Sequence, residues 1–142
     1  MTTDWRARVL EQIDADESAM VGALRELVRI PSVSGSDAEH EIQDHMAAAL
    51  TSDGLEVDHW PLPLADLMAA HDFPGSEVER TEAWGLVGRL PGSGDGPSLM
   101  LNGHVDVVPE GDLGAWTGRD AFSGSIVDGA LHGRGACDMK AG

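Results

Sequence analysis

Histidine and aspartate stand two positions apart in a stretch that could hold a metal ion. The motif is Asn102-Gly103-His104-Val105-Asp106, inside an apolar run that predicts a strand. Alternate residues of a strand point to the same face, so His104 and Asp106 are expected side by side. A carboxylate next to a metal-binding imidazole fixes its tautomer and raises its basicity. The motif is short, however, and a buried histidine–aspartate pair that only satisfies itself explains it equally well.

A second candidate ligand follows a glycine-rich passage, Gly133-Arg134-Gly135-Ala136-Cys137-Asp138. Glycines at positions 133 and 135 predict close backbone packing or unusual dihedral angles. A carboxylate held after such a rigid passage could bridge two metal ions. Taken alone, an aspartate in the position of Asp138 is more often a helix N-cap, a position that aspartate favours.

Two helices are predicted ahead of these motifs. The first covers residues 4–30 and ends before Pro31, because proline disfavours helical backbone in the residue before it. Its buried stripe has helical spacing and consists of Met20, Val21, Leu24, Leu27 and Val28. Ser36 and Glu39 predict a capping box that opens the second helix, and Gly54 suits the position after its end. The inner face of that helix is predicted as Ile42, Met46, Ala49 and Leu50.

The strands that should position the motifs come next. Residues 55–60 and 84–90 read as strands, with a short helix over 64–70 between them. The run 98–108 is almost continuously apolar, which predicts a strand buried on both faces in the middle of an α/β sheet. A loop through Trp116 and Phe122 leads to a hairpin over 125–132, turned by Asp128-Gly129.

Composition excludes several classes of partner and of fold. The chain has 142 residues, the size of one domain, and a formal net charge of −16. Such acidity argues against nucleic acid and against an anionic membrane surface as partners. A single cysteine, Cys137, allows no internal disulfide. No signal peptide and no apolar run of membrane-spanning length is visible, so we expect a cytoplasmic protein.

Other polar residues have simpler interpretations. His40 and His45 are predicted on a solvated helix face, and His59 and His71 in or near loops. His132 has no metal-type spacing. Cys137 has no recognisable base beside it and is interpreted as a small packed thiol. The glycine run 92–96 lacks the ending of a phosphate-binding loop, which favours a surface turn.

Taken together and in order, the motifs resemble the dizinc metallopeptidase and deacylase family. That family includes acetylornithine deacetylase, succinyl-diaminopimelate desuccinylase, aminoacylase and glutamate carboxypeptidase. The resemblance is carried by the segments 29–34, 101–109, 122–124 and 133–140, together with Trp116 and Asp128-Gly129.

The resemblance implies a fold and a role for each matching residue. The fold would be a three-layer α/β/α zinc-hydrolase catalytic domain, with residues 1–142 as its N-terminal portion. His104 would bind one zinc ion, Asp106 would orient His104, and Asp138 would bridge two zinc ions, for which Co²⁺ is a possible substitute. A cis peptide bond is expected between Asp138 and Met139.

The implied chemistry is hydrolysis of an amide bond in an N-acyl amino acid or a related small molecule. The family's general base is a glutamate followed directly by a glutamate that binds zinc, and this sequence contains no Glu-Glu pair. We therefore expect a piece of a longer enzyme, inactive alone, whose full-length form is a homodimer. Two alternatives stay open: a dipeptidase or carboxypeptidase of the same family, and a non-catalytic fragment that acts as a folding or interaction module.

Overall fold

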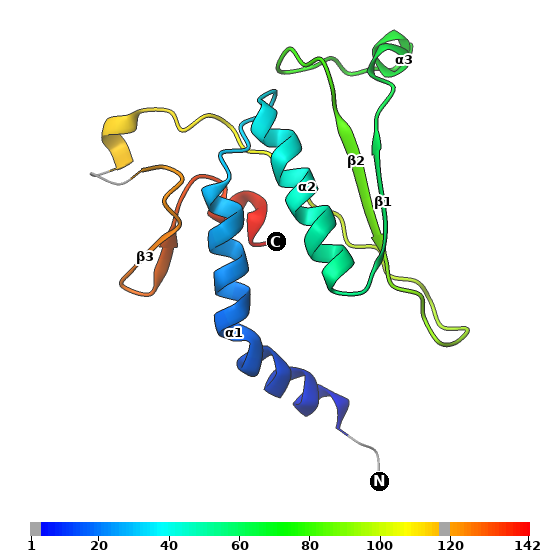
Figure 1. The fold of residues 1–142 in the computed structure, drawn as a ribbon, viewed down its shortest axis with the longest axis vertical. Coiled ribbons are helices and arrows are strands. Elements are labelled where there is room, and N and C mark those ends of the chain that lie inside the picture. Colours follow the sequence, from blue (N-terminus) through cyan, green and yellow to red (C-terminus); the bar gives the residue numbers. More distant parts are fainter. Residues whose placement is uncertain (1–3, 117–119) are drawn as a thin grey trace.

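Helices and strands are mixed along the chain in the computed structural model, which describes residues 4–116 and 120–142. The elements, shown in Figure 1, are α1 (Trp5–Arg29), α2 (Asp37–Ser52), β1 (Glu56–Pro61), α3 (Leu64–Ala69), β2 (Trp84–Arg89), the 3-10 turn η1 (Leu113–Trp116), β3 (Ser125–Val127), β4 (Ala130–His132) and the turn η2 (Ala136–Lys140). The mixture of helix and strand confirms the predicted α/β class.

Helix α1 agrees with its prediction to within one residue at each end. The carboxylate of Asp4 caps its first turn by accepting the backbone N–H groups of Arg6 and Ala7. Only Val28 of the predicted stripe is fully buried, and Met20 is exposed. The N-terminal half of α1 extends away from the rest of the chain (Figure 1), so burial begins where the helix meets the C-terminal turn.

Helix α2 packs on the antiparallel hairpin of β1 and β2, whose register pairs Glu56 with Arg89. Ile42 of this helix is fully buried, whereas Ala49, predicted on the same face, is exposed. Gly54 has φ +84° just after the helix, as predicted. The predicted strands 55–60 and 84–90 and the short helix are all confirmed.

The predicted capping box is wrong. Ser36 makes no side-chain cap; its hydroxyl donates instead to the carbonyl of Val33 at 2.6 Å. The Glu39 carboxylate accepts the N–H of Gly35 at 2.7 Å and a guanidinium N–H of Arg80, also at 2.7 Å. Arg80 is far from Glu39 in the sequence, so this ion pair is a tertiary contact. The bond to Gly35 in addition ties Glu39 to the loop that precedes α2.

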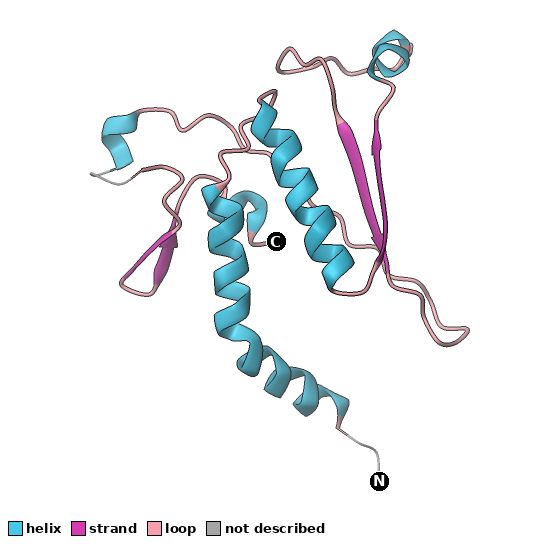
Figure 2. Cartoon of the chain, viewed as in Figure 1, coloured by secondary structure: helices cyan, strands magenta, loops and turns pink. Residues whose placement is uncertain are grey.

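The predicted central strand over 98–108 is also wrong. Figure 2 shows the path from β2 to η1 as loop, and within the described residues only Val107 makes a bridge, parallel to Val33. Leu99, Met100 and Leu101 are 83%, 89% and 86% exposed. A strand buried on both faces needs hydrogen-bonded neighbours on both sides. Within the part of the chain that the structure describes, this run makes a single β-bridge. The apolar pattern alone therefore does not make it a strand.

Strands β3 and β4 form the predicted hairpin, with φ +51° at Asp128 and φ +77° at Gly129. Positive values at both central residues are what a type I′ turn requires. Part of the predicted loop ahead of this hairpin, residues 117–119, lies outside the described residues. Among the helices that are described, none combines the length and the apolar character needed to cross a membrane.

Candidate metal centre

The imidazole of His104 lies between two aspartates that come from different parts of the chain. Its Nδ1 is 3.1 Å from the carbonyl oxygen of Asp106 and 3.2 Å from that residue's Oδ1. Its Nε2 is 3.3 Å from Oδ1 of Asp138. The structure therefore brings together the three residues that the sequence analysis selected.

The two contacts on Nδ1 determine what Nε2 can do. Both partners of Nδ1 are oxygen acceptors, so a neutral ring must carry its proton on Nδ1. The lone pair of Nε2 then faces the Asp138 carboxylate, and two electron-rich atoms 3.3 Å apart repel each other. A cation shared by the two atoms, either a proton or a metal ion, removes that repulsion. Nε2 of His104 and Oδ1 of Asp138 are thus placed to bind one cation together.

Protonation of His104 responds to the same surroundings. Burial acts to lower the pKa of His104, but the hydrogen bond to Asp106 and the negative charges of Asp106 and Asp138 outweigh it and raise the pKa above 6.5. In the absence of a metal ion, the proton is thus the cation that these carboxylates attract. Binding of a metal ion there must displace it.

Asp106 is itself held in place by a residue that the sequence analysis passed over. The hydroxyl of Ser34 donates to Oδ2 of Asp106 at 2.7 Å, and that of Ser32 donates to the carbonyl of Val105, also at 2.7 Å. The loop after α1 also pairs through the backbone, because Val107 donates to Ser32 and Ser34 donates to Val107. The segment 29–34 belonged to the resemblance, but its two serines gave no sign on their own that they would contact the site.

The turn η2 carries Asp138 to the site and packs against α1 (Figure 1). A Cβ on Gly133 would collide with the side chain of Val28, and one on Gly135 with that of Val107. Both glycines are thus required by close packing, as predicted. The Asp138–Met139 peptide bond is cis, which confirms that expectation.

Lys140 fastens the turn to the end of α1. Its ammonium group, buried with 6% of the residue exposed, donates to the carbonyls of Leu27 at 2.8 Å and Ile30 at 2.9 Å. A cation at the C-terminal end of a helix is favourable because it pairs with free carbonyl groups there. Burial lowers the pKa of Lys140 to about 8, while the charge of Asp106 acts in the opposite direction.

The donor atoms suit a zinc ion in kind and in spacing. Zinc binds imidazole nitrogen and carboxylate oxygen at about 2.0–2.2 Å, so two ligands of one tetrahedral ion lie roughly 3.3 Å apart. His104 Nε2 and Asp138 Oδ1 are 3.3 Å apart, and the Asp138 side chain is 90% exposed, with room for further ligands.

Three of the simpler interpretations were wrong. Cys137 is exposed and therefore is not a packed thiol. His40 and His59 do not lie on a solvated face or in a loop: His59 is in β1, facing α2, and ligand atoms of His40, Asp44 and His59 lie within 4.8 Å of one another. Sequence spacing could not reveal this group because it joins a helix to a strand.

A histidine and an aspartate that converge in this way, with a carboxylate behind the histidine, are typical of the centre of a metal-dependent hydrolase. Comparison with known proteins agrees. Residues 100–142, which include all three site residues, match the model of peptidase family M20/M25/M40. The resemblance to the metallopeptidase and deacylase family predicted from the sequence is thereby confirmed.

Relatives of the chain include enzymes named succinyl-diaminopimelate desuccinylase. The chain is 42% identical to the one from Rhodospirillum centenum over 86% of its own length, and 40% identical to the one from Rhodopseudomonas palustris over 83%. It is 37% identical to the one from Methylobacterium radiotolerans over 90% of its length. The aligned part spans only 27%, 26% and 29% of these three relatives, respectively.

Proposed function

We propose that this chain contributes part of the metal centre of a zinc-dependent amidohydrolase that removes an acyl group from an amino acid. The observation that carries the proposal is the approach of His104 Nε2 to Asp138 Oδ1 at 3.3 Å, with Nδ1 of the same ring occupied by Asp106. The relatives named succinyl-diaminopimelate desuccinylase support a succinylated diamino acid as the substrate.

Each of the three residues has a distinct role in this proposal. His104 binds a zinc ion through Nε2. Asp106 is a positioning residue: it accepts the hydrogen bond from Nδ1–H, which keeps the proton of the neutral ring on Nδ1 and leaves Nε2 unprotonated. Asp138 is the second ligand, and its 90% exposed carboxylate is free to reach a second ion with its other oxygen.

Bound zinc would polarise the carbonyl of the scissile amide and make a bound water more acidic. Residues of this chain would hold the two aspartates in position for that reaction. Asp106 is fixed by Ser34, and Asp138 by the packing of Gly133, Gly135 and Lys140. These contacts hold the Asp106 carboxylate and the backbone that carries Asp138, which suits a site that must bind and orient a small substrate.

Further properties of the whole protein follow from the same proposal. A zinc ion takes about four ligands, and His104 and Asp138 supply two, so additional ligands and a general base must complete the centre. We propose that residues 1–142 are the N-terminal portion of a three-layer α/β/α catalytic domain in a homodimer. The single cysteine supports a cytoplasmic location.

Zinc binding tests the centre directly. Isothermal titration of the metal-free chain with Zn²⁺ should show a site that His104→Ala and Asp138→Asn each remove. Asp106→Asn should leave the site present but weaken it about 10- to 100-fold, the usual effect of losing a carboxylate behind a ligand. His132→Ala is the control, because that histidine lies outside the centre. Equal binding by His104→Ala and the wild type would contradict the proposal.

Activity tests the substrate class. The zinc-loaded longer protein, in which other residues would complete the centre, is given a succinylated diamino acid, an N-acetyl amino acid and a dipeptide in parallel, and release of the free amine is measured. Fastest release from the succinylated substrate supports the proposal, whereas preferred cleavage of the dipeptide would favour a peptidase. Two ligands are too few for full activity, so turnover by the 142-residue chain alone would contradict the expectation of an incomplete centre.

A further inference from the structure

A second cluster of ligand atoms lies at the junction of α2 and the β1–β2 hairpin. His40 and Asp44 are four residues apart on α2 and so lie on one face of the helix. His59 faces them from β1. Oδ1 of Asp44 is 3.6 Å from Nε2 of His40 and 3.6 Å from Nδ1 of His59. One carboxylate oxygen therefore stands between two imidazole rings.

These separations are longer than hydrogen bonds but suit ligands of one ion. A nitrogen–oxygen hydrogen bond is about 2.7–3.2 Å long. Ligands of a tetrahedral zinc are roughly 3.3 Å apart, given bonds of about 2.0–2.2 Å. The three ligand atoms all lie within 4.8 Å of one another, so a single cation between them could contact each.

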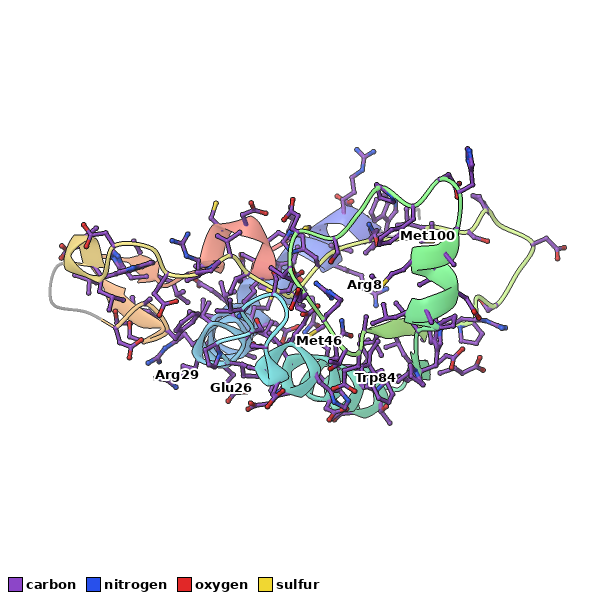
Figure 3. All side chains as sticks on the ribbon, turned by 90° about the horizontal axis from the view of Figure 1, so that it is seen from above. Arg8, Glu26, Arg29, Met46, Trp84 and Met100 are labelled. Carbon is purple, nitrogen blue, oxygen red and sulfur yellow. The ribbon has the colours of Figure 1, made fainter. Side chains whose placement is uncertain are left out.

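Packing holds the two imidazoles where they are. The ring of His40 stacks on that of Trp84, with centroids 4.4 Å apart and an angle of 10° between the planes. Figure 3 shows Trp84 beside α2, and its ring also lies 5.0 Å from that of His59. The His59 side chain is only 16% exposed, and its buried Nε2 has no hydrogen-bond partner among the residues that the structure describes, so its polar contact is through Nδ1.

The surroundings favour a positive charge. Glu82 Oε1 lies 3.7 Å from Nδ1 of His40, and its other oxygen accepts from the indole N–H of Trp84. A carboxylate behind a ligating imidazole orients the ring and raises its basicity. Asp44, with 63% of its side chain exposed, leaves one side of the cluster open to solvent, from which an ion could enter.

We propose that His40, Asp44 and His59 form a second site for a divalent transition-metal ion, separate from the His104 centre. Two imidazoles and one carboxylate select zinc, cobalt, nickel or copper over magnesium and calcium, which prefer oxygen ligands. The bound ion would tie α2 to β1, so its role is structural and it would stabilise the packing of the helix on the hairpin.

The test uses a chain in which His104→Ala and Asp138→Asn remove the other centre, so that failure of the proposed function does not affect it. Zn²⁺ is titrated calorimetrically into this background, and the melting temperature is followed by circular dichroism. We expect one bound ion and a melting temperature that rises with zinc. Adding His40→Ala or Asp44→Asn should weaken binding at least tenfold and abolish the rise.

His45→Ala is the matched control, because it removes an imidazole from the same helix outside the cluster. It should bind zinc as the background does. Asp44→Asn keeps the shape of an exposed side chain and so keeps the test valid if a histidine variant fails to fold. The proposal is overturned by a background that binds no zinc, by unchanged binding in both His40→Ala and Asp44→Asn, or by equal loss in His45→Ala.

Discussion

The hydroxyl of Ser34 donates a 2.7 Å hydrogen bond to Oδ2 of Asp106, across 72 positions of the sequence. The other oxygen of the same carboxylate faces Nδ1 of His104 at 3.2 Å. The loop after α1 therefore reaches the candidate ligand through one intervening side chain. From these contacts we infer that Ser34 positions Asp106 in the proposed centre.

Replacing Ser34 by alanine should weaken zinc binding without removing it. The Asp106 carboxylate loses one of its two anchors, so we expect affinity at the His104 centre to fall about tenfold. The free energy of unfolding should fall by about 1 kcal/mol for the lost hydrogen bond. Calorimetric titration and urea unfolding measure the two effects. Ser36→Ala removes a hydroxyl from the same loop without touching Asp106, and it should bind zinc normally; equal affinities for the two variants would count against the role of Ser34.

Gly135 and Gly129 allow the effect of close packing to be separated from that of backbone conformation. Their φ angles are +78° and +77°, but a Cβ on Gly135 would collide with Val107, while one on Gly129 would meet open space. Gly129→Ala should cost about 1–2 kcal/mol for the left-handed backbone alone. Gly135→Ala should cost more and should also weaken zinc binding, because Asp138 follows it. Chemical denaturation of both variants measures these changes. Equal losses in the free energy of unfolding would show that the close contact at Gly135 does not affect stability.

Lys140 should give the chain a distinct dependence of stability on alkaline pH. Its pKa is about 8 in the folded chain, against 10.5 in the reference state. Between these values the unfolded chain binds more protons than the folded one, so the free energy of unfolding rises with pH across that window. The gain is at most about 3.5 kcal/mol, since one pKa unit corresponds to about 1.4 kcal/mol.

Denaturation of the metal-free chain at several pH values measures this gain. Lys140→Met removes the titrating group and should remove its part of the rise between pH 8 and 10.5. The variant should also be less stable above pH 8, because the carbonyls of Leu27 and Ile30 lose their donor. The same rise in Lys140→Met as in the wild type would assign it to another group.

The pH should affect two properties that depend on His104 in opposite directions: the stability of the metal-free chain and its affinity for zinc. Its pKa is raised in the metal-free chain, so the favourable contribution of the charged ring is fully present below 6.5 and is lost as pH rises through the folded pKa. Zinc binding needs the unprotonated ring, so affinity should fall by about tenfold per pH unit below that pKa. Nuclear magnetic resonance of the imidazole protons reports the pKa, and calorimetry reports the affinity. In Asp138→Asn the pKa should move downward, and an unchanged value would contradict the role of that carboxylate.

Local elements of this protein could be read from its sequence because short-range rules govern them. Pro31 ends α1, Gly54 follows α2, and Asp128-Gly129 turns the β3–β4 hairpin, each through the backbone angles that those residues allow or forbid. His104, Asp106 and Asp138 were selected on different grounds. Each motif alone left a structural explanation open, and the resemblance of the ordered motifs to a metallopeptidase and deacylase family implied their roles.

Only the tertiary structure decided the features that depend on partners far apart in the sequence. The run 98–108 has the composition of a buried strand, yet a strand forms only where neighbours accept its hydrogen bonds, and composition does not encode their presence. The gathering of His40, Asp44 and His59, and the anchoring of Asp106 by Ser34, likewise depend on how α2 packs on β1 and how a loop meets a distant segment. Local sequence determines backbone preference, whereas packing between elements determines which side chains meet.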